Sequence, residues 1–200
     1  MQGDLFDAGI INGRRGKAAV TRVGPDSVAF RFEPGNDPPP ADPIHLLVAL
    51  PRPQTARKIL NEATTLGVAS IRFFASEKGE PGYAASSLWS TREWRRHLVD
   101  GASQAFDTRL PEVLHAAGLA DSLEVLPAGA RIALDNYEAP GRMAPSAGTR
   151  PITLAFGPER GWSASERDQL RNCGFALVHL GARVLRTETA VAAALSIAKA

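Results

Sequence analysis

The sequence predicts an α/β protein whose main domain is built on a mostly parallel β-sheet. Apolar strand patterns alternate with amphipathic helix patterns from about residue 44 onward, as is typical of a parallel sheet covered by helices on both faces. A proline-rich stretch separates this region from an earlier β-hairpin pattern. Two glycine-containing turns near the end of the chain each follow an apolar strand, which is where open α/β sheets bind ligands.

Residues 1–33 are expected to form a small β segment. Lys17–Val23 and Ser27–Phe32 have strand patterns, and Gly24-Pro25-Asp26 between them is typical of a turn. Because an isolated hairpin is not stable in water, this segment is expected to pack against another part of the molecule. Residues 34–43 are rich in proline, which predicts a stiff linker, so the main domain is expected to span residues 44–200.

The helices of the main domain carry recognisable end signals. Gly67 is expected to stop the first helix, and Thr91 and Thr187 are expected to cap the second and the last. Ser163, followed three residues later by Glu166, predicts a capping box. In chain order the expected elements are a strand at 44–50, a helix at 53–66, a strand at 69–74, a helix at 91–105, strands at 131–134 and 152–156, a helix at 163–173, a strand at 176–180 and a helix at 187–199, with a long loop at 136–150.

The composition is that of an ordinary globular protein, with 44% hydrophobic and 22% charged residues in a chain of 200. No run of about 18 apolar residues predicts a membrane span, and Met1–Leu5 show no signal-peptide pattern. The single cysteine, Cys173, excludes an internal disulfide. A cytoplasmic location is therefore expected.

Charge alone does not predict nucleic-acid binding, because the formal net charge is only +2. Any attraction for RNA would have to come from local clusters. One cluster is Arg92, Arg95 and Arg96, and another is Arg52 and Arg57 at a strand-to-helix turn. These side chains are suited to phosphate contacts, although either cluster is read equally well as ordinary solvated surface charge.

Two turns are candidate ligand loops. Gly157-Pro158-Glu159 follows the strand at 152–156, and its glycine would let a ligand approach the backbone beside a carboxylate. Leu180–Ala190 contains the start of the last helix, where backbone amides can face a ligand. Without a ligand, the first would be a plain turn before a capping serine. Arg186 and Glu188 in the second would then form a structural ion pair.

Several other site classes are not indicated. The four histidines share no metal-ligand spacing and one cysteine cannot complete a zinc site, so no metal is expected. No Gly-Lys-Ser/Thr follows the glycine turn, which excludes a P-loop, and no Gly-x-Ser-x-Gly indicates a serine hydrolase. A small-molecule nucleotide-binding enzyme on a Rossmann-like sheet stays as an alternative, although the Gly-x-Gly-x-x-Gly turn is missing.

Six blocks of sequence, taken in order, resemble the RsmE family of SPOUT methyltransferases, which methylate N3 of a uridine in 16S ribosomal RNA. The resemblance runs from about residue 44 to residue 200, and the last two blocks are the most specific. The blocks are Leu50-Pro51-Arg52-Pro53, Leu66-Gly67-Val68, Glu77-Lys78, Gln104 with Leu110-Pro111-Glu112-Val113, Gly157-Pro158-Glu159, and Leu180-Gly181 with Leu185-Arg186 and Glu188-Thr189-Ala190.

The resemblance implies an α/β fold with a C-terminal trefoil knot, a homodimer, S-adenosylmethionine as the cofactor, and 16S ribosomal RNA or the small ribosomal subunit as the partner. The loops after three strands would bind the cofactor. The residues expected to do so are Leu134, Asp135, Phe156, Gly157, Pro158, Leu180, Gly181, Val184, Leu185 and Thr189.

The implied reaction needs help from the protein, because the N3 position of uridine carries a proton at neutral pH. A base must remove that proton, or a cation must stabilise the anion that forms. Glu159 and Arg186 are the candidates for these roles. Arg109 is a third candidate, because it is the basic group nearest to a family arginine position that Phe106-Asp107 occupy here.

This chain also departs from the family pattern in ways that affect substrate handling. Ser103 replaces a glutamate, and Arg160 stands where the family usually has glycine. The segment from Gly3 to Phe32 resembles only the later half of the PUA-like barrel that precedes the family's catalytic domain. A catalytically impaired, RNA-binding relative of the same fold is therefore a further alternative.

Overall fold

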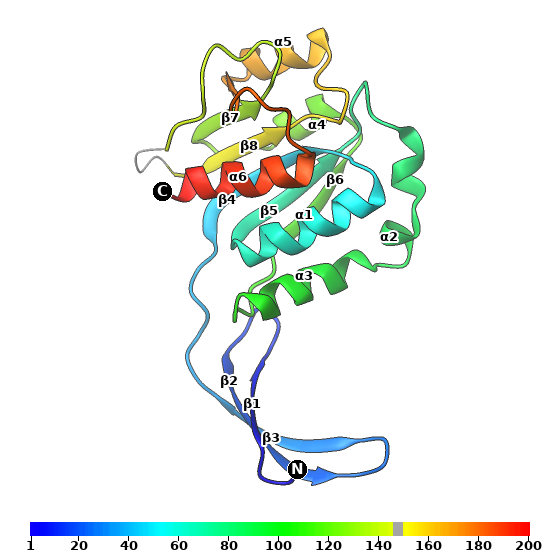
Figure 1. Cartoon of the computed structure of the whole chain (residues 1–200), viewed down its shortest axis with the longest axis vertical. Coiled ribbons are helices and arrows are strands. Elements are labelled where there is room, and N and C mark those ends of the chain that lie inside the picture. The colour runs from blue at the N-terminus through cyan, green and yellow to red at the C-terminus, as the bar shows by residue number, and fades with distance from the viewer. Residues whose placement is uncertain (146–149) are drawn as a thin grey trace.

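The computed structural model describes residues 1–145 and 150–200. It contains two separate β-sheets, a three-stranded one near the N-terminus and a six-stranded one in the rest of the chain. Figure 1 shows the small sheet projecting away from the larger, helix-covered part of the molecule. No helix among the described residues is long and apolar enough to cross a membrane.

The N-terminal sheet is antiparallel and consists of β1 (Leu5–Gly9), β2 (Arg15–Val23) and β3 (Val28–Pro34). The predicted hairpin is confirmed as β2 and β3, whereas β1 was not predicted because its polar and apolar residues do not alternate clearly. The sheet contacts the main domain through its β1–β2 turn. There the Asn12 amide donates to the Thr108 carbonyl at 2.8 Å, and Asn12 Oδ1 accepts from the Leu110 amide at 2.9 Å.

The segment after β3 is extended, and residues 35–41 contain no helix or strand. Proline explains this conformation, since it fixes φ and cannot donate to a sheet ladder. Pro38 is nevertheless buried. The guanidinium of Arg109 donates to the carbonyls of Pro39, at 2.6 Å, and Pro38, at 3.4 Å, so this segment is attached to the main domain by hydrogen bonds.

The main sheet is entirely parallel, with strand order β6-β5-β4-β8-β7-β9. The prediction of a mostly parallel α/β sheet is therefore confirmed. Because every strand runs the same way, the loops that follow the strands gather at one edge of the sheet. The strands are β4 (Asp42–Ala49), β5 (Val68–Phe74), β6 (Glu112–Ala116), β7 (Ala130–Leu134), β8 (Ile152–Phe156) and β9 (Ala176–Val178), of which only β6 was not predicted.

Helices cover both faces of this sheet (Figure 1). The odd-numbered residues of β4 pack with α4 (Leu119–Leu123) and α5 (Ala164–Asn172), and the even-numbered residues pack on the other face. That other face is covered by α1 (Pro53–Thr65), α3 (Trp94–Gln104) and α6 (Thr187–Lys199), with the short η1 (Pro81–Ala85) and α2 (Ser87–Ser90) leading into α3.

Helix ends show where the sequence signals succeed and fail. The capping box of α5 is present, with Ser163 and Glu166 exchanging hydrogen bonds. Thr91, however, does not cap α3, because it ends α2 and its hydroxyl donates to the Ser87 carbonyl. Thr187 is not the cap of α6 either, because Arg186 occupies the N-cap position and makes no side-chain capping bond.

Candidate cofactor pocket and adjoining basic cavity

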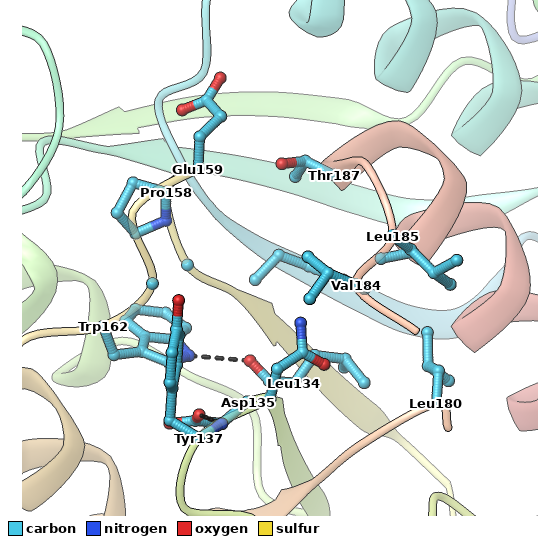
Figure 2. Close-up of a pocket in the computed structure, with 15 residues that line it drawn as sticks. Leu134, Asp135, Tyr137, Pro158, Glu159, Trp162, Leu180, Val184, Leu185 and Thr187 are labelled. Carbon is cyan, nitrogen blue, oxygen red and sulfur yellow. Dashed lines mark hydrogen bonds between the residues drawn. The ribbon is translucent and has the colours of Figure 1, made fainter. Parts of the chain in front are cut away.

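A pocket lies at the carboxyl edge of the main sheet, where the loops after β7, β8 and β9 meet (Figure 2). Its walls combine apolar side chains with polar ones from two of its sides. Figure 2 shows Glu159 and Thr187 on one side of the pocket and Asp135 and Tyr137 on the opposite side. The lining residues are Leu134, Asp135, Asn136, Tyr137, Phe156, Gly157, Pro158, Glu159, Gly161, Trp162, Leu180, Val184, Leu185, Thr187 and Ala190.

Asp135 shapes the first of the three loops. Its carboxylate accepts hydrogen bonds from the backbone amides of Tyr137 and Glu138, and it pairs with the buried Arg167 of α5. Burial of the carboxylate raises its pKa, but the hydrogen bonds from Arg167 and the two amides outweigh this effect, so the pKa of Asp135 is lowered. The Asp135 carboxylate is therefore an internal anchor of the loop.

Trp162 shapes the second loop. Its ring is 1% exposed and stacks nearly parallel on Phe74, with the ring centroids 6.0 Å apart. The indole N–H donates to the Leu134 carbonyl at 2.9 Å and so joins the second loop to the end of β7. A Cβ at Gly157 would lie 3.1 Å from two carbons of the Trp162 ring, so glycine fits this close approach better than any larger residue.

The third loop follows β9 and is attached to the segment after β7. The amide of Met143 donates to the His179 carbonyl at 2.9 Å, and the amide of His179 donates to the Gly141 carbonyl at 3.0 Å. Gly181 has φ +136, which favours glycine, and its amide donates to Nδ1 of His179. Val184 is 80% exposed at the pocket.

A second, strongly charged cavity adjoins this pocket. Glu159 and Thr187 line both, so they mark the place where the two meet. The buried Glu188 carboxylate is paired with Lys58 at 3.1 Å rather than with Arg186, so the structure does not contain the ion pair of the alternative reading. The basic side chains that line this cavity are Arg52, Lys78, Arg160 and Arg186, and the other lining residues are Thr55, Glu80, Tyr83, Glu159, Thr187 and Glu188.

Most of the residues expected to bind a cofactor lie together, but two do not line the pocket. Gly181 lines a neighbouring hollow with Arg142. Thr189 is exposed on α6, because the pocket-facing positions of that helix are Thr187 and Ala190, which are three residues apart. The residues found together are Leu134, Asp135, Phe156, Gly157, Pro158, Leu180, Val184 and Leu185.

The three candidate catalytic residues separate into two places. Glu159 and Arg186 line the same charged cavity. Arg109 lies instead at the junction with the N-terminal sheet, where its guanidinium binds the Pro38 and Pro39 carbonyls. Within one chain, the structure therefore does not bring Arg109 to the other two residues.

The candidate RNA-binding arginines are also dispersed. Arg52 lines the charged cavity, whereas Arg57 is paired with Glu93 at 2.8 Å. Hydrogen bonds from Arg57 and His97 lower the pKa of Glu93 to about 2. Arg95 and Arg96 are exposed on α3, but Arg92 precedes that helix and has φ 59, so it does not share the helical face expected from spacing.

Several lining residues were missed by sequence reasoning, namely Asn136, Tyr137, Gly161, Trp162, Thr187 and Ala190. Trp162 had a usable signal, because it lies within the glycine turn after β8. In residues 1–145 and 150–200, no group of three or more His, Cys, Asp or Glu side chains is arranged to hold a metal ion.

Comparisons with known proteins agree on one family. The model of the RNA methyltransferase domain family matches residues 38–199. The ribosomal RNA small subunit methyltransferase E of Treponema pallidum is 33% identical over 208 aligned residues, which cover 98% of this chain and 76% of that protein.

Solved structures share the fold. The ribosomal RNA small subunit methyltransferase E of Neisseria gonorrhoeae, bound to S-adenosyl methionine, superposes with a TM-score of 0.79 at 23% identity, covering 98% of this chain and 82% of that one. A putative methyltransferase of Legionella pneumophila in complex with the same cofactor gives a TM-score of 0.77 at 21% identity, covering 98% and 92%. Together with the family match, these findings show that the chain belongs to the RNA methyltransferase family that includes the small-subunit ribosomal RNA methyltransferases E.

Proposed function

We propose that this protein transfers a methyl group from S-adenosylmethionine to N3 of a uridine in 16S ribosomal RNA. The observation that carries the proposal is the junction at Glu159 and Thr187, where an apolar pocket at the carboxyl edge of the sheet meets a cavity lined by four basic side chains. Such a junction suits a reaction between a nucleoside cofactor and a polyanionic substrate. Family membership supports the same assignment.

The pocket fits the cofactor in chemical character. S-adenosylmethionine combines a flat, weakly polar base with a charged amino-acid end, and the pocket combines apolar side chains with polar and charged ones. Gly157 lets the loop backbone approach the Trp162 ring closely, and both residues line the pocket. When bound, the cofactor supplies an electrophilic methyl group, so the reaction needs no metal.

The protein's own task is then to handle the proton on N3 of uridine. Glu159 is exposed at the junction and is suited to accept a proton from a group in the charged cavity. Arg186 is exposed beside it and is suited to stabilise the negative charge that develops on the base. Arg52 and Arg160 line the same cavity and would contact phosphates.

The test compares Glu159→Gln and Arg186→Ala with the wild-type protein in methyl transfer to isolated small ribosomal subunits. Loss of a proton acceptor or of a charge-stabilising group is expected to lower kcat by about 100-fold or more. The affinity for S-adenosylhomocysteine, measured by calorimetry, should change much less. The matched control is Arg183→Ala, an exposed arginine near Arg186 that lines neither cavity. Unchanged turnover in the Glu159 and Arg186 variants would remove both roles.

An RNA-binding protein without turnover is the second candidate. It is favoured by Phe106 and Asp107, which occupy positions where the family usually has arginine. In that case the protein would bind S-adenosylhomocysteine and RNA but transfer no methyl group to small subunits. Transfer above the rate of the Glu159→Gln variant would decide in favour of the enzyme.

We further infer that the protein is a cytoplasmic homodimer whose C-terminal region is knotted. We also infer that residues 44–200 form the catalytic domain and that residues 1–33 form a partial PUA-like β segment. The attachment of the third loop to residues 141–143 supports the knot. The exposed Tyr137 and Val184 beside the pocket support the dimer, because a partner would cover their apolar surface. Light scattering at several protein concentrations tests the dimer, and a monomeric mass throughout would refute it.

A further inference from the structure

Phe106, at the end of α3, has an unusual backbone conformation and an unusually exposed aromatic side chain. Its side chain is 66% exposed and its φ is 53, in the left-handed region that disfavours residues other than glycine. The Asp107 amide donates to the Ala102 carbonyl at 2.9 Å, which closes the helix in the manner of a Schellman motif. Glycine is the usual residue at this position, so a large aromatic side chain is held here at a cost in stability.

Phe106 is one of the residues that line a cavity between α3 and the N-terminal sheet. This cavity shares no lining residue with the cofactor pocket or the charged cavity. Val99 and Ala102 give it an apolar wall, while Asn36 and Ser103 supply groups that can donate and accept hydrogen bonds. A flat, hydrogen-bonding ligand suits such a mixture.

Two acidic residues, Asp7 and Asp107, and two basic ones, Arg15 and Lys17, line this cavity, and exposed arginines extend its basic side along α3. Arg95, Val99 and Ala102 recur at helical spacing, so an exposed arginine continues the stripe that lines the cavity. Arg96 is exposed next to it. On the sheet side, Arg15 donates to the Phe106 carbonyl at 2.6 Å. Asp7, which lines the same cavity, pairs with Lys17 at 2.7 Å, and Arg15 forms no ion pair with a carboxylate in the described part of the chain.

We propose that Phe106 stacks on an unpaired base of the RNA substrate, with Arg95 and Arg96 contacting phosphates of the same strand. The inference rests on the proposed function, since it takes RNA as the ligand. Aromatic side chains bind unpaired bases of any sequence, because every base offers a flat π-face. The left-handed backbone at Phe106, held by Arg15, presents the ring to solvent beside the polar groups of the cavity.

The experiment measures binding of a fluorescein-labelled, single-stranded oligouridylate by anisotropy. Phe106→Ala keeps a side chain with the same backbone preference but removes the ring, and it is expected to weaken binding by about tenfold. Phe106→Trp should retain affinity, and its indole fluorescence should be quenched as RNA is added. Affinity for a double-stranded RNA of the same length should change little, because its bases are already stacked.

Two controls separate stacking from loss of structure. Phe106→Gly is expected to melt at the same temperature as the wild type or higher, since glycine is suited to the left-handed backbone, yet to bind RNA as weakly as Phe106→Ala. Val23→Ala removes an exposed apolar side chain at the end of β2, opposite Val28 and away from the residues that line this cavity, and should leave RNA affinity unchanged.

The outcomes distinguish this inference from the proposed function. Equal single-strand affinity of Phe106→Ala and the wild type would overturn the stacking role, while methyl transfer to small subunits would still support the enzyme. A wild-type protein that binds no RNA would overturn both. Weaker binding by Phe106→Ala, with unchanged affinity for S-adenosylhomocysteine, would establish a separate RNA contact.

Discussion

Trp162 is a buried and fixed side chain in the wall of the candidate cofactor pocket. Its ring is stacked on Phe74 on one side, hydrogen-bonded to the Leu134 carbonyl, and in close approach to Gly157. Three segments that are distant in sequence therefore contact one rigid side chain. Because the ring is buried and fixed, small changes beside it have no space to relax into.

Gly157→Ala should weaken cofactor binding without unfolding the protein. The new methyl group would lie 3.1 Å from the Trp162 ring, which is closer than ordinary contact, so the ring or the loop must shift. Overpacking of this kind costs about 1–3 kcal/mol, and calorimetry with S-adenosylhomocysteine should show about tenfold weaker binding. Gly141→Ala is the matched control, because a Cβ there meets nothing within 4 Å. Equal affinities of the two variants would contradict the fixed position of the ring.

At the scale of elements, α5 holds the first pocket loop through Asp135 and Arg167. Both side chains are buried, and the carboxylate also caps the turn that follows β7. The capping box at Ser163 fixes the start of α5 and thereby the position of Arg167. Local sequence signals at one helix end thus determine the position of a loop far away in the chain.

Asp135→Asn should destabilise the fold by about 2 kcal/mol, because the buried Arg167 keeps only the more exposed Glu138, at 3.4 Å, as a charge partner. Urea unfolding checks this value. Asp168→Asn on the same helix removes only an exposed pair with Arg171 and should cost less than about 1 kcal/mol.

The pair of Asp135 and Arg167 also predicts that the stability of the fold depends on pH in the acidic range. The pKa of Asp135 is lower in the folded protein than its ordinary value of 3.8. Its contribution is therefore complete above pH 3.8 and is lost as the pH falls through the folded pKa. Unfolding midpoints of the wild type and Asp135→Asn should converge in this acidic range, and a constant difference would argue against the pair.

At the scale of the whole molecule, the N-terminal sheet is attached to the main domain at few points. The contacts made by Asn12 and Arg15 join it to the segment after α3, and Arg109 attaches the proline-rich segment. Since these contacts are mostly single hydrogen bonds near the surface, the orientation of the sheet depends on a small number of interactions.

Arg109→Ala is therefore expected to speed proteolysis within residues 35–41. It removes the two hydrogen bonds to the Pro38 and Pro39 carbonyls but touches neither cavity of the candidate site. Limited proteolysis followed by mass spectrometry measures the cleavage rate, and calorimetry should show unchanged affinity for S-adenosylhomocysteine. Arg31→Ala, an exposed arginine of β3, serves as control. If the two variants were cleaved at the same rate, Arg109 would not hold the segment.

Much of the fold could be predicted from the sequence, because strong periodic patterns at 44–74 and 152–199 match buried strands and amphipathic helices. The elements that were missed lack such patterns. β1 mixes polar and apolar residues, and β6 and α4 contain only five residues each. The start of α3 was predicted too early, because the left-handed backbone at Arg92 interrupts the helix and sequence pattern does not reveal it.

The site was predictable only in part. The glycine turn after β8 and the segment before α6 indicated most of the pocket, because turns at strand ends lie on one edge of a parallel sheet. The anchoring of Asp135 by Arg167 and of Arg109 by proline carbonyls depends on tertiary contacts between distant residues. The spacing of residues along the sequence does not reveal which distant residues form such contacts.

The order of strands has a consequence for how the protein is made. β4 lies between β5 and β8, and α1 packs against α6 at the very end of the chain. A nascent polypeptide that has left the ribosome only as far as β7 therefore holds β4 with one edge unpaired, and the pocket has neither its second nor its third loop. Non-local pairing of this kind delays folding. The ligand site is consequently completed only after synthesis of the last helix, so incomplete chains would not bind the cofactor.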